Sequence, residues 1–129
     1  MTGSAAGYSV RVLALFRDLP GAGSLSGDSG GIATGESMAL DRSAWVRFEA
    51  RVAGKRIVEC RFRAWGCPHV LAAAALAAEW LAGAAGEPAM RCEAATLARE
   101  LDAPAEKIGR LLVVEDASKA LLADAARVQ

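Results

Sequence analysis

The sequence has no excess charge of either sign, because its 129 residues include 15 Lys and Arg and 15 Asp and Glu. It also lacks a basic stripe with interleaved aromatic residues, which argues against a nucleic-acid partner. The longest apolar run, residues 70–78, is too short for a bilayer, and the N-terminus has no basic stretch followed by a signal-type apolar core. We therefore expect a cytoplasmic protein with neither membrane nor nucleic-acid partners.

Cysteine and histidine are scarce, with three cysteines (Cys60, Cys67 and Cys92) and one histidine, His69. An odd number of cysteines at these spacings suggests no disulfide framework, which fits a reducing compartment. Nor does the chain have the closely paired cysteines of a zinc site. Its length suits one hydrophobic core. We expect a disordered tail over residues 1–7 and a single domain over residues 8–129.

The periodicity of apolar residues predicts an α+β fold. Strands are expected at 31–40, 44–52 and 56–65, and helices at 8–17, 68–82, 93–101, 104–112 and 114–127. The short connection at 53–55 makes the strands on either side of it antiparallel. The predicted architecture is a three-stranded antiparallel sheet with helices packed on one face.

The alternation within the strands assigns side chains to faces. Val58, Cys60 and Phe62 share the apolar parity of their strand, so Cys60 is expected to point into the core. Trp45 and Trp65 do not share the positions of the apolar face in their strands. They either form an exposed aromatic patch for a partner or are half-buried aromatics at strand ends. The polar face is a solvated one with charges that pair across strands: Arg47, Glu49, Arg51, Glu59, Arg61 and Arg63.

Cys67 stands where a strand passes into a helix. Gly66 allows a sharp turn, Pro68 suits a first helical position, and helix formers continue to Gly83. Cys67 is therefore expected at or beside the helix N-cap, where free amides and the helix dipole favour the thiolate. The thiolate is the form that binds metal or attacks sulfur. The alternative is a cysteine that serves only as a small buried hydrophobe. Cys92, in a short connection before the next helix, is interpreted as structural or incidental.

Several separated segments resemble one known family. They are Tyr8-Ser9 with Val12, Phe16, Pro20 and 23–25, then Phe62, Gly66-Cys67 and the helix ending at 79–83, then 97–101 and 115–121. In this order and spacing, residues 8–126 resemble the iron-sulfur cluster assembly scaffold family of the IscU or NifU N-terminal type. The resemblance implies an α+β fold, an iron-sulfur cluster or iron as cargo with zinc as an alternative, and a cysteine desulfurase or other assembly proteins as partners.

Most of the ligands that the resemblance implies are replaced in this chain. Members of the family hold a cluster or metal with three cysteines, assisted by an aspartate and a histidine, and only Cys67 stands at one of these positions. Arg42 and Ala44 stand at the positions of the first cysteine and the aspartate. Gly109 and Arg110 stand at those of the histidine and the last cysteine. Because a cluster or structural zinc takes about four donors, Cys67 alone does not complete a site.

Two further residues are weaker ligand candidates. Asp41 is beside the position of the first cysteine. His69 lies in the first helical turn after Cys67, where an exposed side chain is a more common outcome than a ligand. The family motif that recruits a dedicated chaperone falls on residues 103–107 and keeps only Pro104 and Lys107, which argues against chaperone recruitment.

Three functional hypotheses remain. The chain is a scaffold that binds iron or a cluster weakly through Cys67, with missing ligands from a homodimer or a partner. Alternatively, it is a non-ligating, protein-binding or regulatory module of the same fold, or a persulfide acceptor through Cys67. Arg110 either favours the Cys67 thiolate or pairs with Asp41 and seals the vacated pocket. We expect no enzyme, because no carboxylate is placed to orient a catalytic base.

Overall fold

The computed structural model describes residues 8–25, 31–83 and 91–128, so the predicted N-terminal tail lies outside the described residues. In chain order, the helices and strands are α1 (Val10–Asp18), β1 (Ile32–Met38), β2 (Trp45–Ala53), β3 (Arg56–Trp65), α2 (Pro68–Leu81), α4 (Ala94–Glu100), the 3₁₀ helix η1 (Ala105–Lys107) and α5 (Ile108–Arg127). The predicted strands and the helix after Cys67 are therefore confirmed, with bounds that differ by one or two residues at some ends.

The strands form an antiparallel sheet in the order β1-β2-β3, as predicted. Gly54 and Lys55 make a two-residue turn between β2 and β3, both with positive φ (59° and 65°). Such turns match the twist of a hairpin. At the other end of the sheet, Trp45 is the partner of both Met38 and Trp65. This register places three large side chains in one row across the sheet.

A bulge changes the side-chain parity at the start of β3. The register shifts between Arg51 and Val52, and Val58 has no cross-strand partner. Ile57 therefore turns into the core, whereas Val58 is 51% exposed. The predicted inward orientation of Val58 is wrong, because one extra residue reverses the alternation on one side of a bulge. Beyond the bulge the predicted parity holds, and Cys60 is buried.

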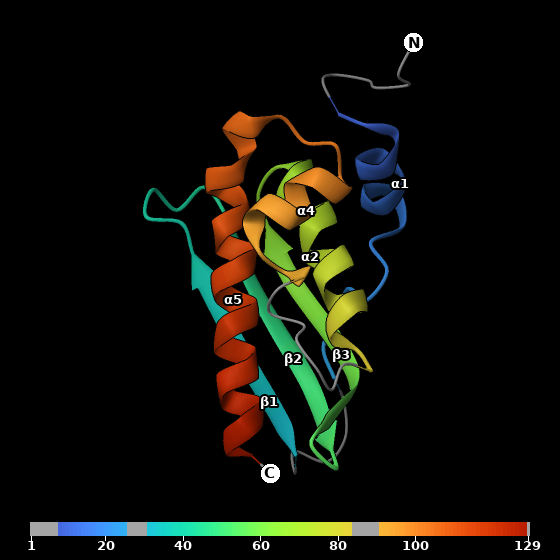
Figure 1. The fold of residues 1–129 in the computed structure, drawn as a ribbon, viewed down its shortest axis with the longest axis vertical. Helices are drawn as coiled ribbons and strands as arrows, with labels where there is room; N and C mark the ends of the chain where they lie inside the picture. Colours follow the sequence, from blue (N-terminus) through green and yellow to red (C-terminus); the bar gives the residue numbers. More distant parts are fainter. Residues whose placement is uncertain (1–7, 26–30, 84–90, 129) are drawn as a thin grey trace.

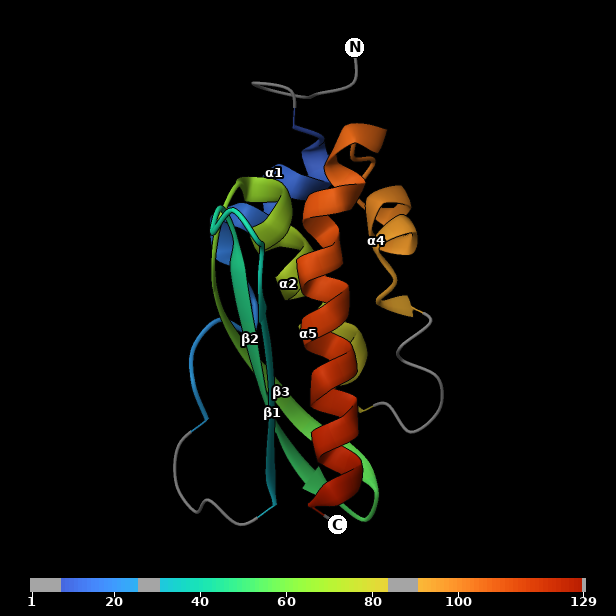
Figure 2. The same cartoon turned by 90° about the vertical axis from the view of Figure 1, so that its left-hand side faces the viewer.

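The helices cover one face of the sheet (Figures 1 and 2). Helix α5 packs against β1 and β2, and α2 packs against β3. Helix α4 lies farther from the sheet against α5, and α1 packs along α2. The buried side chains form one hydrophobic cluster between sheet and helices. The α+β class and the one-sided helix layer are thereby confirmed.

Small residues set how closely the helices approach the sheet. All residues from Ala72 to Ala78 are buried, and Leu76 and Leu81 supply the larger buried side chains of α2. Gly35 lies directly under α5, where an added Cβ would collide with the Leu121 nitrogen and stand 2.6 Å from the Ala117 oxygen. Helix α5 therefore rests on the backbone of β1.

The C-terminal helix is longer than predicted. The sequence pattern indicates separate helices at 104–112 and 114–127, but α5 runs without a break from Ile108 to Arg127, preceded only by the turn of η1. Val113 and Val114 are both buried within α5. No glycine or proline interrupts residues 110–127, so nothing in the backbone ends a helix there.

Candidate functional site

Cys67 is the N-cap of α2, as predicted. Its backbone is extended (φ −77°, ψ 165°), Pro68 follows at the first helical position, and its carbonyl accepts hydrogen bonds from the Val70 and Leu71 amides. The thiol is partly exposed and makes no side-chain cap hydrogen bond. Because the Cys67 sulfur makes no capping hydrogen bond and is partly exposed, it can bind a ligand or react with a partner protein.

The turn before Cys67 packs against the turn between β1 and β2. Gly66 has φ 147°, in the region that favours glycine. A Cβ added at Gly66 would lie 3.2 Å from the Ala44 Cβ and 3.3 Å from the Val70 Cβ. Ala44 itself is fully buried. The β1–β2 turn, which carries Asp41, thus lies beside Cys67.

Arg110, in the first turn of α5, reaches the same β1–β2 turn. Its Nη1 donates to the Ser43 Oγ over 2.7 Å, and the Ser43 Oγ donates to the Asp41 Oδ1 over 2.6 Å. Hydrogen bonds from the Ser43 side chain and amide hold the pKa of Asp41 below its usual range, with a smaller effect from the Arg110 charge. Arg110 and Asp41 are therefore linked, but through Ser43 instead of by direct pairing.

Ser43 is the residue that our sequence reasoning missed. It follows Asp41 by two positions, and its amide donates to the Asp41 carboxylate over 3.0 Å. An Asp that accepts from the backbone two residues later is the usual geometry of an Asx turn. That spacing was visible in the sequence, whereas the bond to Arg110 spans 67 positions and was not.

His69 does not lie on the surface. It is 1% exposed, its ring centroid is 4.8 Å from that of Tyr8, and neither ring nitrogen has a hydrogen-bond partner among the described residues. Burial lowers the pKa of His69, and the charge of Lys107 lowers it further. The expectation of an exposed first-turn histidine is wrong, because Tyr8, which precedes α1, covers this side of α2.

The other two cysteines belong to the core. Cys60 and Cys92 are buried, and burial raises the pKa of their thiols to about 12 and about 11. Both are therefore protonated at neutral pH and poor nucleophiles. The inward orientation of Cys60 is confirmed.

Cys67, Asp41 and His69 are the donors that the sequence singles out for a metal ion. Within the described residues, no group of three or more His, Cys, Asp or Glu side chains is placed to hold a metal ion. Cys67 and Asp41 lie on adjoining turns, while Arg110 brings a cation to the Asp41 turn. The positive charge of Arg110 partly compensates the negative charge of Asp41, which weakens the attraction of that carboxylate for a metal ion.

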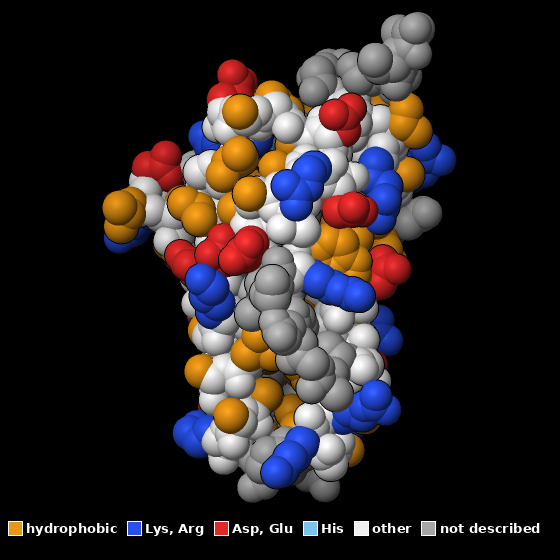
Figure 3. All heavy atoms as spheres, viewed as in Figure 1, with side chains coloured by type: hydrophobic (Ala, Val, Ile, Leu, Met, Phe, Trp, Pro, Cys, Tyr) orange, Lys and Arg blue, Asp and Glu red, His pale blue; other side chains and the backbone are white. Residues whose placement is uncertain are grey.

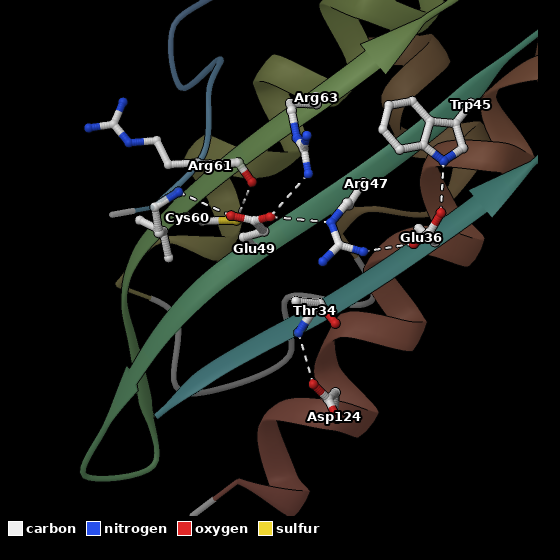
Figure 4. A network of polar contacts seen from close by, with 10 residues as sticks. Thr34, Glu36, Trp45, Arg47, Glu49, Cys60, Arg61, Arg63 and Asp124 are labelled. Atoms are coloured by element: carbon white, nitrogen blue, oxygen red, sulfur yellow. Dashed lines mark hydrogen bonds and ion pairs between the residues drawn. The ribbon is translucent and has the colours of Figure 1, made fainter. Parts of the chain in front are cut away.

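Trp45 and Trp65 form an aromatic row near this site, on the outer face of the sheet, which is the face turned away from the helices. The Trp45 and Trp65 rings stack with centroids 6.3 Å apart, and Trp65 is 44% exposed. Met38 continues the row, and Leu40 at the tip of the β1–β2 turn is fully exposed. The Trp45 indole donates to Glu36 over 2.9 Å (Figure 4). Trp65 is therefore exposed and Trp45 is half-buried, so the pair combines the two alternatives that the sequence left open.

The rest of the outer face carries the predicted ion pairs. Figure 4 shows Glu49 between Arg47 and Arg63, and Glu36 beside Arg47. On the opposite, helical face, acidic and basic side chains are interspersed (Figure 3). Among the described helices, none is both long and apolar enough to cross a membrane.

The model of the NifU-like N terminal domain matches residues 7–127. The iron-sulfur cluster assembly scaffold protein IscU of Rickettsia prowazekii is 29% identical over 118 residues, covering 91% of this chain and 90% of that protein. The IscU of Buchnera aphidicola is 30% identical and covers 91% and 93%. The crystal structure of a NifU-like protein (N-terminal) from Brucella abortus superposes with a TM-score of 0.67 at 12% identity, over 92% and 94% of the chains.

The family match covers nearly the whole chain. The solved neighbour independently supports the fold. The chain belongs to the NifU-like N-terminal domain family, the family of the IscU-type iron-sulfur cluster assembly scaffolds.

Proposed function

We propose that this chain is a scaffold-like protein of iron-sulfur cluster assembly in which binding of iron or a cluster is weakened or lost. The observation that carries this proposal is the donor set: Cys67 is partly exposed at a helix N-terminus, and the described residues offer no group of three donors around it. Clusters are held by about four donors, mostly thiolates. Cys67 would be the main contact to the cargo, with Asp41 and His69 as weaker candidates.

The missing ligands would come from outside the chain. A homodimer or a partner protein that brings thiolates to the Cys67 end would complete a set of donors. The stacked Trp45 and Trp65, with Met38 in the same row, supply partly exposed apolar surface for such a contact, and Trp65 is two residues before Cys67. We propose a cysteine desulfurase or another assembly protein as the partner and the cytoplasm as the compartment.

A second candidate is a persulfide acceptor, favoured by the Cys67 sulfur having no cap hydrogen bond. In this reaction the Cys67 thiolate attacks the outer sulfur of a persulfide on a donor protein. The sulfur-sulfur bond of the donor breaks, its cysteine leaves as a thiolate, and the persulfide is now on Cys67. If neither chemistry occurs, the chain acts as a protein-binding or regulatory module of the same fold. None of these roles makes it an independent enzyme.

Anaerobic reconstitution with iron and sulfide distinguishes these functions. We compare wild type, Cys67→Ser and the buried control Cys60→Ala by visible absorbance and metal analysis. We expect substoichiometric iron that is lost in Cys67→Ser and kept in Cys60→Ala. A stoichiometric, stable cluster on the isolated chain would contradict weakened binding.

Mass spectrometry after incubation with a desulfurase and cysteine tests the second candidate, because it would identify a persulfide on Cys67. If neither iron nor a persulfide is found, the protein-binding or regulatory module is the function that agrees with both experiments.

A further inference from the structure

The hydrogen bonds of Ser43 join two elements that are remote in sequence. The hydroxyl accepts from the Arg110 guanidinium and donates to the Asp41 carboxylate, so both of its bonds are charge-assisted. The positive charge of Arg110 and the negative charge of Asp41 therefore lie on either side of the Ser43 hydroxyl. This arrangement links the first turn of α5 to the β1–β2 turn without any added ion.

The β1–β2 turn needs such support. Arg42 has φ 61°, a conformation that costs a non-glycine residue about 1 kcal/mol. Inside the turn, the Ala39 amide donates to the Ala44 carbonyl over 2.9 Å, and the Arg42 amide donates to the Ala39 carbonyl over 2.8 Å. Asp41 and Arg42 are exposed, so little burial stabilises the tip itself. A contact from outside the turn therefore has a large influence on its order.

The same turn supports the Cys67 segment. Ala44 is buried and packs against Gly66, immediately before Cys67. Movement of the β1–β2 turn would thus remove one wall of the turn that presents the thiol. In this way three segments meet at one end of the molecule: residues 39–44, residues 66–67 and the start of α5. In Figure 1 the starts of α2 and α5 lie at the same end, opposite the C-terminus.

We propose that Arg110, Ser43 and Asp41 form a polar clamp that keeps the Cys67 end of the molecule ordered with no metal ion bound. The inference deepens the proposed function and rests on it only in the shortage of donors. In metal-bound proteins, an ion supplies the cross-links between ligand-bearing segments. Here two side-chain hydrogen bonds perform that mechanical role, and Arg110 and Ser43 act as positioning residues for the turn.

Amide hydrogen exchange of the isolated chain in EDTA tests the clamp. We expect the Arg42 and Ala39 amides to be protected in wild type, and their exchange to accelerate about tenfold in Arg110→Ala and in Ser43→Ala. Arg110→Lys and Ser43→Thr, which keep a donor and a hydroxyl, should retain most of the protection. The amides of β2 serve as the internal control for folding and should exchange at wild-type rates in every variant.

Two results would overturn the clamp. One is an Arg110→Ala variant whose turn amides exchange as in wild type. The other is a wild-type turn that is unprotected in EDTA and becomes protected when zinc is added, since the metal would then provide the order. Failure of the proposed function appears in a different measurement, the iron content after reconstitution, so either proposal can fail while the other stands.

Discussion

Gly35 is a residue at which a single methyl group decides whether two elements can pack. In Gly35→Ala the new Cβ would collide with the backbone of α5 at Leu121 and Ala117, and backbone atoms cannot rotate away. We expect a loss of about 3 kcal/mol in the free energy of unfolding, measured by urea denaturation. Gly109→Ala is the matched control, because it lies in α5 with open space around it and should be neutral or stabilising by up to about 1 kcal/mol. Equal stabilities of the two variants would contradict this view of the contact.

His69 predicts a pH dependence at the residue scale. Burial and the Lys107 charge lower its pKa below the ordinary 6.5, so the folded state holds the neutral ring. As the pH falls below about 6.5, the unfolded chain takes up a proton that the folded chain does not, and stability decreases. We expect the free energy of unfolding to decline between pH 7.5 and pH 5.5 in wild type and to be flatter in His69→Leu. Parallel pH profiles for the two proteins would refute the assignment.

At the scale of elements, Asp124 fastens the C-terminal half of α5 to the edge strand β1. Its Oδ2 accepts from the Thr34 backbone amide over 2.8 Å, and this bond is the main cause of the lowered pKa of Asp124 (Figure 4). Asp124→Ala leaves that edge amide without its partner. We expect a loss of about 1 to 2 kcal/mol in unfolding free energy.

Arg127→Ala is the control for Asp124. It removes the ion pair with Asp124 but keeps the bond to Thr34, so its cost should stay below about 0.5 kcal/mol. Because the pKa of Asp124 is depressed, its contribution is present at neutral pH and is lost only as the pH falls below the ordinary value of 3.8. An Arg127→Ala variant as unstable as Asp124→Ala would assign the effect to the ion pair.

For the whole molecule, the three thiols differ in how much of the fold must unfold before a reagent reaches them. Cys67 is partly exposed, whereas Cys60 and Cys92 are buried, with pKa values of about 12 and about 11. We expect iodoacetamide to modify Cys67 in the native protein and the other two only after unfolding, as counted by mass spectrometry. Native-state modification of Cys60 or Cys92 at the rate of Cys67 would show that the core opens locally.

Local patterns in the sequence sufficed for much of this architecture. The alternation in the strands, Gly66 before Pro68 and the alanine-rich run after it place Cys67 at the start of α2, because turn and helix-start preferences act within a few residues. The same parity predicted the buried Cys60 and placed Trp45 and Trp65 off the apolar face of their strands. It failed at Val58, because a bulge depends on the partner strand.

The sequence by itself therefore determined where each strand and the central helix lie and which cysteine is presented at a helix N-terminus, since backbone preferences and side-chain periodicity are short-range. Tertiary structure alone decided that Tyr8 covers His69 and that Ser43 connects Asp41 to Arg110. Contacts between residues tens of positions apart depend on how the sheet and helices pack together, and the local pattern around either residue does not encode them.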